Sequence, residues 1–434
     1  MIAFGCFLFS LAMFSATEAE QLILTLVDPI REAETVDLTP EGCLNRILAA
    51  PVVSELDFPH WDNSAMDGYA LRASDVQQVP ITLTVIEEIP AGKSPQKTVA
   101  TGQAARILTG AMMPPGADTV VMQEETERDG DRVTVLQVPS PRSFVRHRGS
   151  FYQAGKALLE TGRAIAPAEI ALLAAAQQTR LSVYRRPRIA ILSTGNELIR
   201  PDQPLQAGQI VDSNQYALAA LVAQTGAVPV PLGIVPDEQA AVKEAIASAL
   251  AQADMVLSTG GVSVGDYDYI DDVLATLGAT LHIRSVAVKP GKPLTVATFD
   301  QGATQLYFGL PGNPASAMVG FWRFVAPAIA KLSGQLGPWS PEFVWAIATS
   351  DLRAGGGRET YLWGQLSGQL GSQLGGQLGR QPREQPVGYT FERAAGGHSS
   401  GNLVNLANIS GLGIVPQGET LIEAGQAVRV LKIR

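Results

Sequence analysis

Polar segments containing glycine follow several short apolar runs of this 434-residue sequence. One is STGNE at residues 193–197, and another is STGGVS at residues 258–263. Backbone N–H groups that precede a helix and carry no bulky side chains bind phosphate well. Either segment alone is weak evidence, because glycine turns after strands are common, but together they predict a phosphate-binding site. We expect the ligand to contact Thr194, Gly195, Gly260, Gly261 and Ser263.

Three carboxylates lie within or just after these two segments. Glu197 belongs to the first, and Asp266 and Asp268 follow the second. Carboxylate oxygens beside a phosphate site are the usual ligands of Mg²⁺ bound with a nucleotide. We therefore expect these three residues to hold a divalent metal, although a pair of aspartates before a helix is also typical of helix capping.

Two later segments add positive charge and the start of a helix. KPGKP at residues 289–293 places the ammonium groups of Lys289 and Lys292 on a rigid turn. GLPGNP at residues 309–314 opens a helix, with Asn313 suited to the N-cap and Pro314 to the first helical position. Both features favour an anion electrostatically. The four segments together predict binding of a nucleotide-linked anion, for which the protein supplies charge and position rather than a covalent nucleophile.

Two segments nearer the N-terminus also carry polar groups. DNSAMDGY at residues 62–69 holds Asp67 in a turn-forming stretch, and RILTGA at residues 106–111 holds Thr109 at the end of a strand-like run. Both are also compatible with ordinary loops. The histidines are scattered and suggest neither a metal cluster nor a catalytic triad. We expect all four to be structural or solvated, namely His60, His147, His282 and His398.

The elements that must position these residues fall into several parts. Residues 1–14 are almost wholly apolar but shorter than the ~20 residues of a membrane-spanning helix, so we expect a frayed extension. Residues 15–54 and 148–186 show helical apolar spacing and predict one discontinuous helical domain. Between them, residues 55–147 contain short β-rich runs separated by Pro and Gly turns, which predict an all-β insertion.

Residues 187–333 alternate strand-like and helix-like patterns. Strands are expected at residues 188–193, 228–235, 255–258 and 305–310, and a helical pattern follows each of them. This alternation predicts a three-layer α/β domain with a parallel sheet and helices on both faces. Ligands bind such sheets beyond the carboxyl ends of the strands, which is where the polar segments lie.

Residues 341–434 return to β-rich patterns and predict a separate C-terminal β domain. Within it, residues 364–379 repeat Gly-Gln-Leu with Ser and Gly spacers. Such a run buries little apolar surface, so we expect it to form an exposed loop. The whole sequence therefore predicts a multidomain protein of the α/β plus β class.

The composition excludes some classes of function. Lys and Arg number 32 and Asp and Glu number 41, which gives a formal net charge of -9. No basic surface field therefore favours nucleic acid or an anionic membrane, and an anionic ligand must meet a local basic site. The two cysteines, Cys6 and Cys43, are too few for a disulfide framework or a structural zinc site. They fit a reducing, cytoplasmic setting.

The sequence resembles the molybdopterin molybdenumtransferases, the family that includes MoeA and the gephyrin E domain. The resemblance extends from about Ala16 to the C-terminus, and five long motifs in the family's order make it highly specific. The motifs are NSAMDGYA at 63–70, STGNEL at 193–198, TGGVSVGDYDY at 259–269, KPGKP at 289–293 and GLPGNPAS at 309–316.

This resemblance implies a four-domain protomer that forms a homodimer. Its cleft would lie between the α/β domain and parts of the partner's β insertion and C-terminal domain. The implied reaction inserts molybdate into the dithiolene of adenylylated molybdopterin and releases AMP, with a divalent metal that is usually Mg²⁺. Transient contacts with the molybdopterin adenylyltransferase and with acceptor molybdoenzymes are implied as well.

The motif matches also imply which residues line that cleft. Asp67 and Thr109 would come from the insertion, and Pro311 and Pro314 would shape the floor. The C-terminal domain would contribute Arg358 and Ser400, which sit in family-like settings. From the α/β domain would come Glu197, Asp237, Asp268, Lys289 and Lys292.

Two places depart from the family's motifs. Where the family usually reads Arg-Gly-Glu-Asp, residues 148–151 read RGSF, and Asn196 replaces the aspartate of Gly-Asp-Glu-Leu. We expect the acids lost at Ser150 and Phe151 to be peripheral, because the other motif residues remain. Two other functions stay open: a non-catalytic scaffold that binds molybdopterin, and a related pterin-nucleotide transferase or hydrolase that shares the α/β domain alone.

Overall fold

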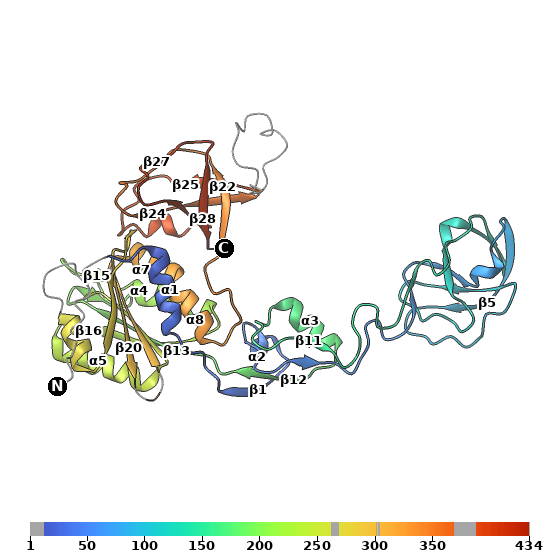
Figure 1. Ribbon diagram of the computed structural model, residues 1–434, viewed down its shortest axis with the longest axis horizontal. Helices are drawn as coiled ribbons and strands as arrows, with labels where there is room; N and C mark the ends of the chain where they lie inside the picture. The colour runs from blue at the N-terminus through green and yellow to red at the C-terminus, as the bar shows by residue number, and fades with distance from the viewer. Residues whose placement is uncertain (1–12, 262–268, 301, 303, 369–387, 434) are drawn as a thin grey trace, which may run out of the picture. The chain divides into compact units, whose positions relative to one another are not determined.

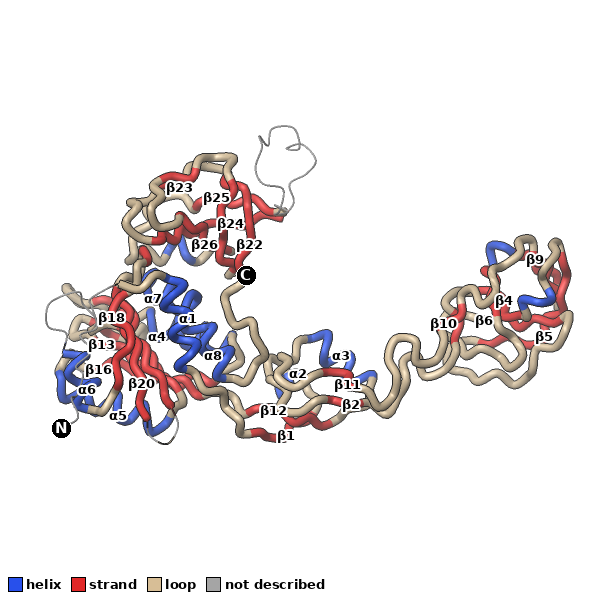
Figure 2. Tube along the Cα trace, viewed as in Figure 1, coloured by secondary structure: helices blue, strands red, loops and turns tan. Residues whose placement is uncertain are grey.

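The computed structural model describes residues 13–261, 269–300, 302, 304–368 and 388–433. Three predicted site residues, Ser263, Asp266 and Asp268, lie outside the described residues, as does nearly all of the N-terminal apolar stretch. The chain divides into two compact units. The first consists of Met1–Ala49, Gly162–Ala166 and Ser182–Arg434, and the second of Ala50–Thr161 and Pro167–Leu181. Figures 1 and 2 show their helices and strands.

The first unit contains a six-stranded sheet with the order β16-β13-β17-β21-β20-β18. Its strands are β13 (Arg188–Thr194), β16 (Val228–Val235), β17 (Met255–Thr259), β18 (Thr280–Ser285), β20 (Pro293–Asp300) and β21 (Thr304–Leu310). The four strands predicted from the sequence are present and run parallel. Our expectation of a wholly parallel sheet is wrong, because β20 runs antiparallel to β21, and β18 antiparallel to β20. Asp300 pairs with Thr304, and so short a connection forms a hairpin, whereas a parallel pair needs a crossover of about a dozen residues or more.

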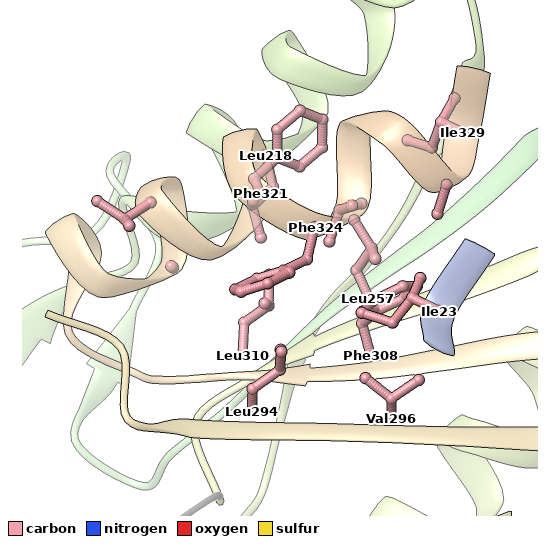
Figure 3. Close-up of a cluster of buried hydrophobic side chains, with 14 of the residues drawn as sticks. Ile23, Leu218, Leu257, Leu294, Val296, Phe308, Leu310, Phe321, Phe324 and Ile329 are labelled. Atoms are coloured by element: carbon pink, nitrogen blue, oxygen red, sulfur yellow. The ribbon is translucent and has the colours of Figure 1, made fainter. Parts of the chain in front are cut away.

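Helices cover both faces of this sheet and give the predicted three layers. Side chains of β13 alternate between the faces, so that Ile189 and Ile191 join one buried cluster, and Ala190 and Leu192 join the other. The second cluster contains side chains from α5 and α6. The first cluster, part of which Figure 3 shows, contains side chains from the other helices. The helices are α1 (Ala16–Leu26), α4 (Asn214–Gln224), α5 (Gln239–Gln252), α6 (Tyr269–Thr276), α7 (Pro314–Gly320) and α8 (Ala326–Leu332). Among the described residues, no helix combines the length and apolar character that a membrane crossing requires.

Helix α1 packs within this α/β domain. Ser15 and Glu18 cap its first turn reciprocally, and the buried Ile23 lies in the same cluster as Leu257 and Phe308, as Figure 3 shows. This corrects our expectation that the helix belongs to the discontinuous helical domain. An amphipathic pattern identifies the apolar face of a helix, but it does not identify the surface that covers that face.

The rest of residues 15–54 and 148–186 is less helical than we expected. Helix α2 (Pro40–Cys43) has a single turn, and Asn45 just beyond it adopts a left-handed φ of 59°, which ends the helical path. Helix α3 (Pro167–Ala175) is present where the sequence predicted it. Two strand pairs accompany these helices. They are β1 (Ala33–Asp37) with β12 (Arg180–Tyr184), and β2 (Val52–Val53) with β11 (Ala157–Leu159).

The second unit contains a β-rich insertion, as the short β-rich runs separated by Pro and Gly turns predicted. Its sheet has the order β7-β4-β6-β5-β9-β8. A small apolar cluster lies on each face, with Leu83 and Val133 in one and Ile89 and Ile107 in the other. The strands are β4 (Gly68–Leu71), β5 (Ile81–Ile89), β6 (Gln103–Ile107), β7 (Thr119–Met122), β8 (Thr126–Asp129) and β9 (Arg132–Val135).

The C-terminal domain is a closed β-barrel. Its strands are β22 (Phe343–Ala348), β24 (Glu359–Gly368), β25 (Tyr389–Arg393), β26 (Gly411–Val415) and β28 (Ala427–Lys432). Pairing of β24 with β26 closes the ring. Residues 364–368, which we expected to begin an exposed loop, instead pair with β25, because strand hydrogen bonding continues past the apolar part of β24. The remainder of the expected loop, residues 369–379, lies outside the described residues.

Candidate functional site

A basic groove of about 660 Å³ lies between the α/β domain and the barrel within the first unit. None of the described residues that line it is acidic, and five of them are cationic. These are Lys289, Lys292, Arg353, Arg358 and Arg393. In a chain whose formal net charge is -9, this concentration of positive charge forms the local basic site that an anionic ligand needs.

A short parallel strand pair brings two of these cations together. Strand β19 (Val288–Lys289) pairs with the start of β24, so that Lys289 is opposite Thr360. Arg358 donates a hydrogen bond from Nη1 to the carbonyl oxygen of Val288 at 3.1 Å. Lys292 follows three residues after Lys289 on the turn that leads into β20. The lysines that the sequence singled out therefore line the same groove as Arg358.

The loop around Ser400 forms another wall of the groove. The carbonyl oxygen of Ser400 accepts a hydrogen bond from the N–H of Ala315 at 2.9 Å, which fixes this loop of the barrel to the first turn of α7. Pro314 occupies the first turn of α7, as predicted, and Asn313 stands at the N-cap without a side-chain capping bond. Asn313 and Ser400 both line the groove.

His398 is a groove residue that we expected to be merely structural or solvated. Its ring lies against Trp363 with 4.6 Å between centroids, and its Nε2 is 3.1 Å from the carbonyl oxygen of Ala394. Burial, together with the charge of Arg393, holds the pKa of His398 below its usual range. The sequence reasoning also missed Arg353 and Arg393. Only the adjacency of His398 to Ser400 offered a signal for any of the three.

The loops after β13 and β17 bring a second group of predicted residues together. Gly260 has a φ of +85°, and a Cβ there would collide with the carbonyl oxygen of Thr194, so this approach requires glycine. Glu197 folds back over Gly195, with its Oε2 2.8 Å from the place that a Cβ on residue 195 would occupy. Gly261 follows in the same turn and also lies beside Thr194.

Two more predicted residues flank these loops. The N–H of Asp237 donates to Oδ1 of Asn196 at 3.0 Å, which ties the end of β16 to the loop after β13. Pro311 directly follows β21. Within the described ranges, no group of three His, Cys, Asp or Glu residues is placed to hold a metal ion. Of the three predicted metal ligands, Glu197 is the one whose position is described.

Asp67 and Thr109 are in direct contact in the second unit. Oδ1 of Asp67 accepts hydrogen bonds from the Thr109 hydroxyl at 2.7 Å and from the Thr109 N–H at 2.6 Å. These two bonds hold the pKa of Asp67 below its usual range, and the bond from the hydroxyl has the larger effect. The next residue, Gly68, packs so tightly on the backbone of Val121 that a Cβ would not fit. The carboxylate is thus held by the loop after β6, and it directly precedes the tightly packed first residue of β4.

The departure from the family's acidic pair lies on the surface of the second unit. Phe151 is 73% exposed, and its N–H donates to the carbonyl oxygen of Phe58. Arg148 of the same segment donates from Nε to Asp57 at 2.6 Å, and Asp57 also accepts from the N–H of Ala154. The loop therefore keeps an ordered hydrogen-bonded structure without the two acids.

Comparisons with known proteins connect both units to one family. The family "MoeA N-terminal region (domain I and II)" matches residues 14–176, and the "Probable molybdopterin binding domain" matches residues 190–331. A molybdopterin molybdenumtransferase of Nostoc sp. is 52% identical over 428 residues, which are 97% of this chain and 94% of the relative. The corresponding protein of Haemophilus influenzae is 39% identical over 75% of this chain and 80% of its own length.

A solved structure agrees with this assignment. The molybdopterin biosynthesis moeA protein of Pyrococcus horikoshii OT3 superimposes with a TM-score of 0.77 at 29% sequence identity. The match covers 97% of this chain and 100% of that one. The chain therefore belongs to the molybdopterin molybdenumtransferase family, whose members serve molybdenum cofactor biosynthesis.

Proposed function

We propose that this transferase inserts molybdate into adenylylated molybdopterin and releases AMP, and that the basic groove binds the molybdate. The observation that carries the proposal is the gathering of five cationic side chains, with no acidic residue among the described residues that line the groove. Two unit charges about 4 Å apart attract by ~1 to ~4 kcal/mol when the effective dielectric constant lies between 80 and 20. A dianion in contact with several of these cations would be held firmly.

The groove residues would each interact with the anion in a different way. Arg358 has a planar guanidinium that can donate two parallel hydrogen bonds to an oxyanion, whereas Lys289 and Lys292 act as compact point charges. The Ser400 hydroxyl can donate to a further oxygen. Groups placed in this way stabilise negative charge as it moves between molybdate, dithiolene and phosphate, without forming a covalent bond to the substrate.

The glycine turns after β13 and β17 would hold the nucleotide end of adenylylated molybdopterin. Gly260 and Gly261 lie in this turn beside Thr194, and backbone N–H groups of residues without side chains suit the binding of a phosphate. Carboxylate oxygens of Glu197, Asp266 and Asp268 suit Mg²⁺, and Glu197 already lies over Gly195 beside this turn. Bound Mg²⁺ would neutralise charge on the phosphate.

The proposal extends to assembly and location. We propose a homodimer, in which Asp67 and Thr109 of the insertion and the groove residues serve the same reaction, as the family resemblance implies. Transient contacts with the adenylyltransferase and with acceptor molybdoenzymes fit this place in the pathway. The low cysteine content, with Cys43 a free thiol, supports a cytoplasmic location.

Turnover tests the proposed reaction. The purified protein is mixed with adenylylated molybdopterin, Mg²⁺ and molybdate, and AMP is measured with and without molybdate. We expect molybdate-dependent AMP release, with the KM for molybdate raised at least about tenfold in Lys292→Gln, since a tenfold change corresponds to ~1.4 kcal/mol. Lys243→Gln, which alters an exposed lysine on α5, is the matched control and should behave as wild type. Molybdopterin binding without AMP release would support the scaffold function, and AMP release independent of molybdate would support a pterin-nucleotide hydrolase.

A further inference from the structure

A buried network of charged and polar side chains lies next to the basic groove. Arg323 is 3% exposed, Glu20 is 7% exposed and Tyr361 is 1% exposed. The three residues come from different elements, because Glu20 belongs to α1, Tyr361 to β24, and Arg323 to a π-helical turn, η3 (Phe321–Val325), that connects α7 to α8. Such turns are rare and often occur at functional sites.

The contacts in this network form a continuous chain. Arg323 donates from Nη1 to Oε2 of Glu20 and from Nε to the Tyr361 hydroxyl, the latter at 3.0 Å. The Tyr361 hydroxyl donates in turn to Oε1 of Glu359. The guanidinium also lies over the ring of Phe343, with 5.5 Å to its centroid. One buried arginine therefore connects α1, the π-helical turn and the first residues of β24.

This connection ends at the wall of the groove. Tyr361 itself lines the groove, and Arg358 directly precedes Glu359, the first residue of β24. Glu359 is opposite Val288 in the parallel pair that places Lys289 beside the barrel. A slip of β24 by one residue would move Arg358 by ~3.3 Å and reverse the face on which each side chain lies. The register of the β19–β24 pair therefore determines whether Lys289 and Arg358 can contact the same anion.

We propose that Arg323 is a positioning residue, which holds β24 in register with β19 and so sets the spacing of Arg358 from Lys289 and Lys292. The inference rests on the proposed function, because it assigns the network to molybdate binding. Two-residue strand pairing alone provides few hydrogen bonds to define a register. Arg323 supplies a directional contact to β24 at Tyr361. The Tyr361 hydroxyl extends this contact along the strand to Glu359, which is opposite Val288 of β19.

Stability alone does not account for such a network. Burying an arginine and a glutamate removes both from water, and replacing a buried ion pair with apolar residues of similar volume is often neutral or stabilising. A network of this kind is better explained by the specific geometry that its directional bonds impose. This difference provides a way to separate a positioning role from a purely structural one.

The test replaces the network with apolar side chains. The triple variant Glu20→Leu, Arg323→Met, Tyr361→Phe leaves no unpaired arginine and should keep a thermal unfolding midpoint close to that of wild type. We expect its Kd for molybdate, measured calorimetrically with molybdate alone, to rise at least about tenfold. The KM for molybdate should rise in parallel, while kcat changes less than about threefold. A triple variant that folds and binds molybdate as tightly as wild type would overturn the proposal.

Two further variants keep the test decisive. Tyr361→Phe alone preserves the ring and should shift Kd in the same direction by a smaller factor, so it tests the proposal if the triple variant does not fold. Arg46→Met is the matched control, because Arg46 is also a buried, ion-paired arginine, but neither it nor its partner Glu34 lines the groove, whereas Arg323 bonds to the groove residue Tyr361. It should leave the Kd unchanged. If neither Lys292→Gln nor the triple variant changes the Kd, the proposed molybdate site fails, whereas an effect of Lys292→Gln alone rejects only the positioning role.

Discussion

Neighbours that the chain brings close shift the pKa values of single residues in the candidate site. Two hydrogen bonds from Thr109, a residue 42 positions later, lower the pKa of Asp67. Burial and the charge of Arg393 lower the pKa of His398. The sequence singled out Asp67 and Thr109 through family motifs. It gave no sign of Arg353 or Arg393, and for His398 it offered only the adjacency to Ser400. Those three lie on a barrel whose contact with the α/β domain appears only after folding.

The hydrogen bond from the Thr109 hydroxyl to Asp67 predicts how a substitution at Thr109 changes the pKa of Asp67. Thr109→Val removes the hydroxyl, which is the largest cause of the lowered pKa, so the pKa of Asp67 should rise toward its ordinary value of 3.8. The Asp67 carboxyl resonance, followed by NMR between pH 2 and 6, measures this midpoint. Thr109→Ser retains the hydroxyl and should leave the midpoint near that of wild type. Equal midpoints in wild type and Thr109→Val would contradict the role assigned to the bond.

His398 predicts a pH dependence of stability with a definite sign. Its pKa in the folded chain lies below the ordinary value of 6.5, so the unfolded chain binds the proton first as pH falls. The stability due to neutral His398 is fully present above pH 6.5 and is lost as pH decreases below it. The thermal unfolding midpoint of wild type should therefore fall between pH 7.5 and 5.5, and His398→Gln should reduce that fall. An identical fall in both proteins would show that other groups cause it.

At the scale of elements, hydrophobic periodicity predicted most strands and helices of the α/β domain. It did not predict β18 or β20, because a hairpin at the end of a parallel sheet leaves no alternation of strand and helix to detect. It also assigned α1 to the wrong part of the chain, since its apolar face is compatible with any apolar surface. Hydrophobic periodicity also failed to predict that β24 continues into the Gly-Gln-Leu repeat. Residues 364–368 pair with β25 through their backbone, which does not require apolar side chains.

The pairing of β24 with β25 predicts where the low-complexity stretch can be removed. Gly368 is opposite Tyr389, so deleting residues 370–387 joins the two strands by a two-residue loop of Gln369 and Gly388. Adding Gln369→Asn gives the Asn-Gly sequence that such loops prefer. We expect the thermal midpoint to stay within about 3 °C of wild type or to rise, because a shorter loop costs less closure entropy.

A deletion that also removes paired residues is the control for that experiment. Removing residues 364–379 takes away the part of β24 that pairs with β25 and should lower the thermal midpoint clearly. If the shorter-loop variant is as destabilised as this control, residues 370–387 stabilise the barrel and our interpretation of the repeat is wrong.

At the scale of the whole molecule, the predicted site residues fall in both compact units. Asp67 and Thr109 belong to the second unit, while Glu197, the two lysines, Arg358 and Ser400 belong to the first. Motifs in the sequence identified residues in each unit, but a sequence alone does not show which chain supplies each residue to one site. The proposed homodimer makes that a question for experiment.

Complementation between two inactive variants shows whether Asp67 and Lys292 of one site come from different chains. Asp67→Ala and Lys292→Ala proteins should each be inactive, and mixing them under subunit exchange should restore AMP release. If half of the dimers are mixed and each has one intact site, recovery approaches about a quarter of wild-type activity. Recovery would also require a particle of twice the 45.8 kDa chain mass. Proven exchange without recovery would place both residues in the site of one chain.

Anomalous diffraction at the molybdenum edge shows directly whether molybdate binds in the basic groove. Crystals of wild type and of Lys292→Gln are grown in the same form and soaked with the same low concentration of molybdate. We predict one strong anomalous peak in wild type, within contact distance of Lys289, Lys292 and Arg358, and a much weaker peak in the variant. A strong peak elsewhere, or an equal peak in both crystals, would contradict the account.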